Sequence, residues 1–270
     1  MMQIKEKEFK YLVQYMKSNY GINLINKKIL IEGRLGNYIS EKGFSSFDEY
    51  INYAVNDSSG REITTLVNKL TTNHTFFMRE ADHFNYLKNK ALPSIIASIK
   101  DRDLRVWSAG CSTGEEPYTL AMIISEFLGD CKKIWDTKIL ATDISVNALE
   151  KAKEGIYSLE AIENLPTSWK YNNFNRIDSK SYRVSDKIRN EIIYRVFNLM
   201  EPVFPFKKKF HIIFCRNVMI YFDEKTKKEL IEKFYQFTEP GGYLFIGHSE
   251  FINKNDTGYK YIMPAVYQKG

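Results

Sequence analysis

Apolar residues recur every three or four positions through the first 70 residues, which is the spacing of one face of an amphipathic helix. Gly43 is placed to end the second of these helical patterns, and Ser46 with Glu49 forms a capping-box pair that opens the third. We therefore expect a small helical domain at the N-terminus, with helices over residues 9–20, 26–42, 46–55 and 61–69.

Beyond this domain the pattern changes. Residues 81–100 continue as a helix that Pro93 breaks or bends, and this helix is expected to link two domains. From Leu104 onward short apolar runs alternate with helical patterns, which is typical of a doubly wound parallel sheet. The expected strands cover 104–109, 139–142, 211–215, 243–247 and 265–268, and the expected helices cover 115–128, 145–155 and 225–237.

One region departs from the alternation. Residues 169–174 form a helical turn, and 181–184 and 191–198 resemble short β segments. We interpret about 168–200 as a small antiparallel subdomain inserted into the sheet domain. The expected fold class is therefore α/β, with a helical N-terminal domain and linker over 1–95 and a Rossmann-like sheet domain over 96–270.

Composition narrows the class of protein. The 270 residues are 44% hydrophobic, enough for a real core, and the net charge of +6 is mild for a nucleic-acid binder. Three cysteines without a C-x-x-C pair favour a reducing compartment. The sequence has no apolar stretch of about 20 residues and no signal-peptide core at its start, so we expect a cytoplasmic protein without direct membrane insertion.

The first strand of the sheet domain ends in a turn of small residues, Gly110 to Gly114, before Glu115 and Glu116 open a helix. Glycine and serine let a ligand approach the backbone, and free amides are expected at the start of the helix. The next strand ends in Asp143, which would lie where an open parallel sheet holds a ribose. The pair of features predicts a nucleoside-containing cofactor.

The same turn indicates which cofactor. It lacks the lysine and hydroxyl of a nucleoside-triphosphate loop, departs from G-x-G-x-x-G, and is followed by two carboxylates that would repel a phosphate. S-adenosylmethionine carries no phosphate and has an ammonium and a sulfonium that carboxylates attract. The residues favour this methyl donor over a nicotinamide cofactor or an empty pocket.

Residues 71–80 interrupt the helical pattern with a polar loop followed by Phe76, Phe77 and Arg79. Buried aromatic rings next to one arginine would hold a guanidinium at the rim of a pocket, where it can bind a carboxylate at two points. An ordinary helix cap with a surface arginine explains the same residues equally well.

Five segments together resemble a known family. TTNHTFFMRE, RVWSAGCSTGEEPY, ATDIS, FCRNVMIYF and EPGGYLFIGHSE, in this order, are similar to the chemotaxis receptor methyltransferases of the CheR family, over about two thirds of the chain. The resemblance implies a class I methyltransferase that moves a methyl group from S-adenosylmethionine to glutamates of chemoreceptors. The products would be glutamyl methyl esters and S-adenosylhomocysteine.

The resemblance also implies site residues. Arg79 and Tyr221 would lie beside the reacting methyl group, and either Glu116 or its neighbour Glu115 would contact the cofactor. The other implied cofactor contacts are Asn73, Thr75, Gly110, Asp143, Asn198, Leu199, Arg216 and Asn217. The four histidines show no metal-ligand spacing, so no metal is expected.

The sequence says least about the binding partners of the protein. The first 40 residues hold seven basic side chains against three glutamates, which is either a solvated helix face or a docking face for an acidic helical target. Some family members tether a receptor tail on the inserted subdomain near a glycine-containing loop, and the corresponding loop here, Ile177 to Ser181, has none. We expect a monomer that acts on the cytoplasmic helical region of chemoreceptors.

Three alternatives remain open. The domain could methylate a carboxylate on a non-chemotaxis acceptor, or bind S-adenosylmethionine as a sensor without catalysis. Nucleic-acid methylation fits least, because the chain lacks both the N/D-P-P-Y tetrad and the Pro-Cys dipeptide of such enzymes.

Overall fold

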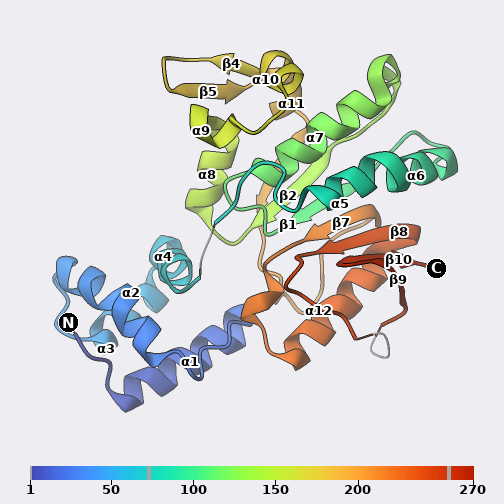
Figure 1. The fold of residues 1–270 in the computed structure, drawn as a ribbon. Coiled ribbons are helices and arrows are strands. Elements are labelled where there is room, and N and C mark those ends of the chain that lie inside the picture. Colours follow the sequence, from blue (N-terminus) through green and yellow to red (C-terminus); the bar gives the residue numbers. More distant parts are fainter. Residues whose placement is uncertain (1, 72–73, 254–256) are drawn as a thin grey trace.

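The structure is a computed structural model that describes residues 2–71, 74–253 and 257–270. It consists of an N-terminal group of helices, a twisted sheet with helices on both faces, and a small separate sheet at one end (Figure 1). The predicted fold class is confirmed. No helix of the described chain is both long and apolar enough to cross a membrane.

The four predicted N-terminal helices are present as α1 (Glu6–Tyr20), α2 (Lys28–Glu41), α3 (Phe47–Asn56) and α4 (Arg61–Leu70). Their apolar stripes meet in one core that includes Leu12, Leu35 and Phe47. The capping box is half formed: Ser46 Oγ accepts the amide of Glu49 at 3.2 Å, whereas the Glu49 carboxylate binds the amide of Ser45.

The helix after this domain packs on the sheet. It consists of α5 (Ala81–Tyr86), a π-helical turn (Leu87–Ala91) and α6 (Leu92–Ser98). Pro93 lies in the first turn of α6, and since proline donates no backbone hydrogen bond, the irregular turn just before it accommodates the break. Phe84 and Leu87 are buried in the core of the sheet. The segment expected to be a linker is therefore part of the sheet domain.

The main sheet has seven strands in the order β6-β2-β1-β7-β8-β10-β9. The first five are parallel, and the last two run antiparallel to their neighbours. Strand β8 begins earlier than predicted, and β9 was not predicted. The strands are β1 (Val106–Ala109), β2 (Ile139–Asp143), β6 (Ile192–Val196), β7 (Phe210–Cys215), β8 (Thr238–Ile246), β9 (Tyr259–Met263) and β10 (Val266–Lys269).

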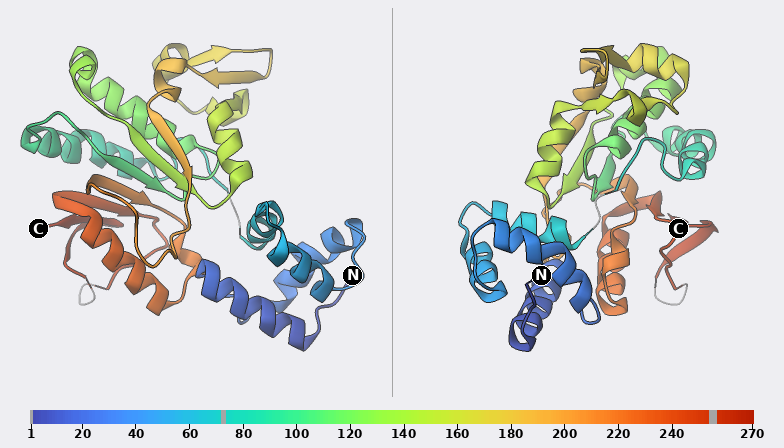
Figure 2. Two further views of the ribbon diagram at one scale, coloured as in Figure 1. Left: turned by 180° about the vertical axis from the view of Figure 1, so that it is seen from behind. Right: turned by 60° about the vertical axis from the view of Figure 1, so that its left-hand side comes forward.

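Helices bury both faces of this sheet (Figure 2). One core contains residues of α5, α6 and α7 (Glu115–Leu128), and the other contains Leu230, Ile231 and Phe234 of α12 (Glu224–Phe237). All four residues of β1 are buried, which explains why this strand is a continuous apolar run in the sequence. Helix α8 (Val146–Glu154) follows β2 and is capped by Ser145 as predicted, with Ser145 Oγ accepting the amide of Ala148 at 3.1 Å.

The inserted subdomain covers 156–189 rather than about 168–200, so it begins and ends earlier in the chain than predicted. Its sheet has the order β3-β5-β4, all antiparallel, and 191–198 does not belong to it, because β6 pairs in parallel with β2. Strand β6 lies at the sheet edge with alternating buried and exposed residues, so its sequence looks like that of an antiparallel strand. The subdomain elements are β3 (Ile156–Ser158), α9 (Leu159–Ile162), α10 (Thr167–Asn173), β4 (Phe174–Arg176), β5 (Ser181–Val184) and α11 (Asp186–Arg189).

Trp107 is fully buried at the centre of the sheet, with the rings of Phe206 and Phe234 at 4.8 and 5.3 Å. Its indole nitrogen donates a hydrogen bond of 2.9 Å to Thr142 Oγ1 on β2. We expect Thr142→Val to lower the free energy of unfolding by about 1–3 kcal/mol, because valine keeps the volume and leaves a buried N–H without an acceptor. Urea denaturation measures this.

Thr167→Val is the matched control, because Thr167 is exposed at the start of α10 and the change should cost less than about 0.5 kcal/mol. Equal stabilities of Thr142→Val and the unchanged protein would contradict the importance of the indole hydrogen bond.

Candidate functional site

A pocket lies where the carboxyl ends of β1, β2 and β7 face the N-terminal helices. Strand β1 is followed in the chain by β2 on one side of it, whereas β7 lies on its other side. The pocket therefore lies at the point where the strand order reverses, the usual ligand position in open parallel sheets.

The turn after β1 forms one wall of the pocket. Gly110 and Gly114 have φ values of +84° and +98°. A Cβ atom on Gly110 would lie 2.5 Å from Val218 Cγ2, and one on Gly114 would lie 2.8 Å from the Cβ of Ala152. Only glycine fits at these two points.

Three amides of this turn are bound to the end of the neighbouring strand. The amides of Gly110 and Cys111 both donate to the carbonyl of Thr142, at 2.8 and 2.9 Å. The amide of Ser112 donates to Asp143 Oδ2 at 2.8 Å. These three donors join the turn after β1 to the end of β2.

Asp143 at the end of β2 lines the pocket. Its second oxygen, Oδ1, accepts the amide of Ser145 at 2.8 Å, so both carboxylate oxygens are held by backbone donors. Burial raises the pKa of Asp143, while these hydrogen bonds act in the opposite direction. The carboxylate is fixed in place and can still accept hydrogen bonds from a sugar through its remaining lone pairs.

The side chains of Glu115 and Glu116, which follow the turn, lie in different surroundings. Glu116 lines the pocket, with Oε1 accepting Ser108 Oγ at 2.7 Å and Oε2 accepting Arg216 Nε at 2.7 Å. The Glu115 carboxylate is buried and binds Thr113 Oγ1 at 2.7 Å, and burial raises its pKa. Between the two candidates, Glu116 is the one in contact with the pocket.

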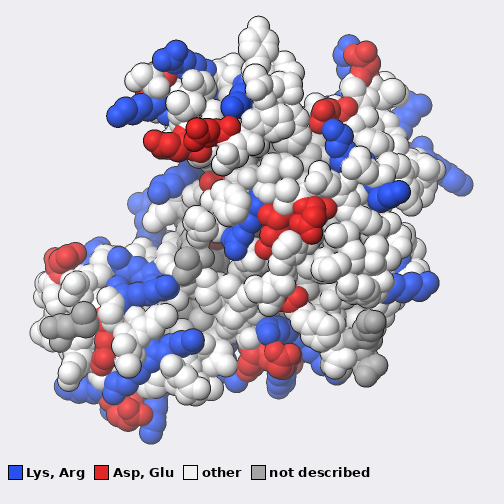
Figure 3. All heavy atoms as spheres, viewed as in Figure 1, with Lys and Arg blue, Asp and Glu red and all other residues white. Residues whose placement is uncertain are grey.

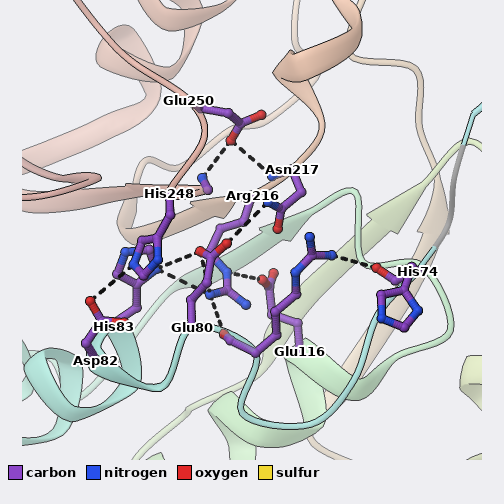
Figure 4. A network of polar contacts seen from close by, with 11 residues as sticks. His74, Glu80, Asp82, His83, Glu116, Arg216, Asn217, His248 and Glu250 are labelled. Carbon is purple, nitrogen blue, oxygen red and sulfur yellow. Dashed lines mark hydrogen bonds and ion pairs between the residues drawn. The ribbon is translucent and has the colours of Figure 1, made fainter.

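Arg216 is the buried cation of the site, with its side chain 3% exposed. Besides Glu116, it donates to the carbonyl of Arg79 at 2.6 Å and lies 3.3 Å from Glu80 Oε2 (Figure 4). Its guanidinium faces the ring of Phe84 at 4.9 Å. It therefore connects three segments that are far apart in the sequence. Arg216 lines the pocket as expected. Its contacts with Glu116, Arg79 and Phe84 join it to other groups of the protein.

The polar loop before α5 contributes Thr75 and Arg79 to the pocket. Arg79 Nη1 donates to the carbonyl of His74 at 2.6 Å. Phe77 is buried as expected, whereas Phe76 is 47% exposed. Asn73, the remaining predicted contact in this loop, lies outside the described residues.

The other predicted residues come from two more loops. Asn198 and Leu199 follow β6, and Asn198 Nδ2 donates to the carbonyl of Asn19 on α1 at 2.7 Å. Asn217 and Tyr221 follow β7, and the carbonyl of Tyr221 accepts the amide of Asn23 at 2.8 Å. Apart from Glu115, the structure brings every described site candidate into the lining of one pocket.

Sequence reasoning missed the contribution of the N-terminal helices. Tyr20, Ile22, Val67 and Asn68 line the same pocket. An antiparallel bridge between Ile22 and Phe222 joins the helical domain to the sheet domain. Two side-chain contacts support this joint: Lys17 to Asp223 at 2.7 Å and Asn68 to Ser145 at 2.8 Å. No local pattern signals a contact of this kind, because it depends on how the domains pack.

Glu80, His83 and His248 also come together, with potential ligand atoms within 4.8 Å of one another, which the sequence spacing does not reveal. Arg216 Nη1 lies 3.3 Å from both Glu80 Oε2 and His83 Nδ1, so a protein cation already faces this carboxylate (Figure 4). Burial, and then the charge of Arg216, lowers the pKa of His83 to about 4. His83 is a neutral part of the packing around Arg216 at pH 7.

Comparison with known proteins agrees with this geometry. Residues 73–267 match the family model described as CheR methyltransferase, SAM binding domain, and residues 7–71 match CheR methyltransferase, all-alpha domain. The chain is 44% identical to a chemotaxis protein methyltransferase of Borreliella burgdorferi, over 98% of this chain and 95% of that one. It is 35% identical to the chemotaxis protein methyltransferase of Escherichia coli, over 92% and 85% of the two chains.

The neutral state of His83 predicts a pH effect on stability. The unfolded imidazole binds a proton below about pH 6.5, whereas the folded one binds it only near pH 4, so acid favours the unfolded chain. Between pH 7 and pH 4.5 this group should cost about 2 kcal/mol of stability. We expect His83→Gln to lose less stability than the unchanged protein over this range in urea denaturation.

His74→Gln is the control, because that side chain is exposed, and this variant should keep the full acid sensitivity. Parallel stability curves for His83→Gln and the unchanged protein would show that His83 does not titrate in this way.

Proposed function

The chain belongs to the CheR methyltransferase family, and from this premise we propose that it transfers a methyl group from S-adenosylmethionine to glutamate side chains of chemoreceptors. The products are glutamyl methyl esters and S-adenosylhomocysteine. The observation that carries the proposal is one pocket in which Asp143 and Glu116 border a glycine turn while Arg79 and Tyr221 line the same hollow.

The residues of the pocket fit S-adenosylmethionine. The carboxylate of Asp143 suits a ribose diol, and Gly110 of the turn lines the same pocket. Glu116 lines the pocket as an ion pair with Arg216. The apolar groups of Leu199 and Phe197 suit an adenine ring. When bound, this cofactor supplies an electrophilic methyl group on a positively charged sulfur.

The acceptor needs little activation. A glutamate side chain has an unperturbed pKa of about 4.3, so it is already ionised near neutral pH and no general base is needed. As the negative carboxylate approaches a positive sulfonium, the charges partly cancel, which a site shielded from water favours. The task of the protein is therefore alignment and exclusion of water.

Two side chains are assigned to that alignment. Arg79, held by the carbonyl of His74, orients the incoming carboxylate through its guanidinium. Tyr221, held through its backbone by Asn23, donates a hydrogen bond beside the reacting methyl group. The N-terminal helices cover the pocket through Tyr20 and Ile22, which excludes water from the same position.

The receptor-binding face is proposed on the N-terminal helices. At the start of α2, Ile29 is 85% exposed and Ile25 is 54% exposed, beside Lys27 and Lys28. Figure 3 shows Lys and Arg side chains over these helices at the lower left. Apolar groups surrounded by positive charge suit an acidic, amphipathic helix, and we assign this face to the cytoplasmic helical region of a chemoreceptor.

We further propose that the protein acts as a monomer in the cytoplasm. All the groups assigned to the reaction come from one chain, so no second copy is needed to complete the pocket. Its three cysteines are free thiols, as expected for a reducing compartment.

The function is tested by incubating the full chain with methyl-labelled S-adenosylmethionine and a receptor cytoplasmic fragment. Labelled methanol released by base identifies glutamyl methyl esters. We expect Tyr221→Phe to lower kcat by about 10-fold or more, with cofactor affinity changed less than about 3-fold, because the lost hydrogen bond acts mainly in the transition state. Calorimetric titration measures the affinity.

Tyr53→Phe is the matched control, because Tyr53 lies on α3, is 49% exposed and does not line the pocket. Absence of base-labile label in the receptor fragment would contradict the proposed function. Affinity lost in proportion to rate would instead reject only the role of Tyr221.

The docking face predicts a second effect. Lys27→Glu combined with Lys28→Glu should raise the KM for the receptor fragment by about 10-fold and leave the affinity for S-adenosylmethionine unchanged, because only the encounter with an acidic partner is weakened. The double change Lys207→Glu and Lys209→Glu alters the net charge equally on exposed residues before β7, and it should leave KM nearly unchanged. Equal effects of the two pairs would contradict a specific docking face.

A further inference from the structure

The loop between β7 and α12 carries five residues of the pocket, Arg216, Asn217, Val218, Tyr221 and Phe222. A carboxylate from the loop after β8 holds it. Glu250 Oε2 accepts the amide of Asn217 at 3.0 Å (Figure 4). Glu250 Oε1 accepts the amide of Ile220 at 3.1 Å. The same carboxylate accepts the amide of Gly247 at 2.6 Å. The Glu250 side chain thus binds both the loop after β7 and the residue that follows β8.

The loop needs such a support because its backbone is unfavourable. Asn217 has φ of +59°, in the left-handed region that costs free energy for a residue with a side chain. The turn that follows, Met219–Tyr221, is a single short 3-10 helix. A segment of this kind has few hydrogen bonds of its own, so contacts from outside determine its conformation.

The end of β8 packs closely against this loop. A Cβ atom on Gly247 would lie 2.5 Å from Asn217 Nδ2 and 2.8 Å from the Asn217 backbone nitrogen. The amide of Glu250 donates to the carbonyl of Gly247 at 2.9 Å, which closes the short turn that directs the carboxylate toward the loop. Glycine at 247 allows the contact and Glu250 secures it.

Glu250 is 8% exposed, so its carboxylate is paired almost entirely with protein groups. Burial raises its pKa, and the hydrogen bonds from the amides oppose this effect. Within the described part of the chain, the carboxylate accepts its hydrogen bonds from backbone amides. It therefore constrains the backbone of the loop directly.

We propose that Glu250 is a positioning residue for methyl transfer, which fixes the loop 217–221 so that Tyr221 faces the reacting centre. The inference rests on the proposed role of Tyr221. Glu250 holds the loop before Tyr221, and Asn23 holds the carbonyl of Tyr221 itself. Loss of the first support lets the ring move while the wall formed by Asp143 and the glycine turn stays in place.

The test is Glu250→Gln in the full chain, alone and combined with Tyr221→Phe. Glutamine keeps the shape but places an NH₂ group against a backbone amide, so one hydrogen bond is lost and replaced by repulsion. We expect kcat to fall by about 10-fold or more and the affinity for S-adenosylmethionine to change less than about 3-fold. In the Tyr221→Phe background the same change should cost less than about 2-fold.

Glu191→Gln is the matched control. Glu191 is also a largely buried carboxylate, with its side chain 14% exposed and bound to Lys132, but it precedes β6 at the opposite end of the strands from the pocket. This variant should keep the full rate of methyl transfer.

The outcomes separate the two proposals. Full activity of Glu250→Gln, with a slow Tyr221→Phe, would overturn the positioning role and leave the proposed function intact. So would losses that multiply in the double variant, because they would show that Glu250 does not act through Tyr221. If Tyr221→Phe keeps the full rate, both the role of Tyr221 and the positioning role fail, whatever Glu250→Gln does.

If Glu250→Gln does not fold, the unchanged protein still tests the contact. Hydrogen exchange should show the amides of Asn217 and Ile220 protected to the level of the neighbouring strand β7. Exchange as fast as in an unstructured loop would overturn the inference.

Discussion

The site depends on one buried cation. Arg216 is a guanidinium with little access to water, and such a group is stable only when nearly all its charge and hydrogen bonds are matched. Its partners are Glu116 after β1, and Glu80 and the carbonyl of Arg79 before α5. Because the Arg216 guanidinium binds all of these groups at once, it fixes the relative positions of the segments that surround the pocket. Removing either carboxylate would leave part of the buried guanidinium without its hydrogen-bond acceptor.

Around this ion the pocket is made by mutual support between loops. The turn after β1 binds the end of β2 through three amides, two of them to the carbonyl of Thr142 and one to the carboxylate of Asp143. The loop after β7 is held by Glu250, which follows β8, and by Asn23, which follows α1. Few of these contacts lie within a single helix or strand, so the rigidity of the site comes from contacts between distant parts of the chain.

The sequence was informative wherever a feature is local. The helix cap at Ser145, the glycine turn and the position of Asp143 at the end of β2 all depend on neighbouring residues, and all were predicted correctly. The assignment of β6 to the inserted subdomain was wrong, because an edge strand exposed on one face has the same alternation as an antiparallel strand. The linker was misjudged for a similar reason: an apolar stripe on a helix does not say which surface it covers.

The approach of the N-terminal helices to the pocket has a thermodynamic consequence. Tyr20 and Ile22 belong to the wall of the pocket, and the same helical domain carries the exposed apolar and basic face at the start of α2. A change in the stability of the contact between these helices and the sheet therefore changes two binding free energies, that of the ligand in the pocket and that of the partner at the start of α2. Thermodynamic linkage requires the two effects to be equal. A partner that stabilises this contact raises the affinity for the small ligand by the same factor by which the ligand raises the affinity for the partner.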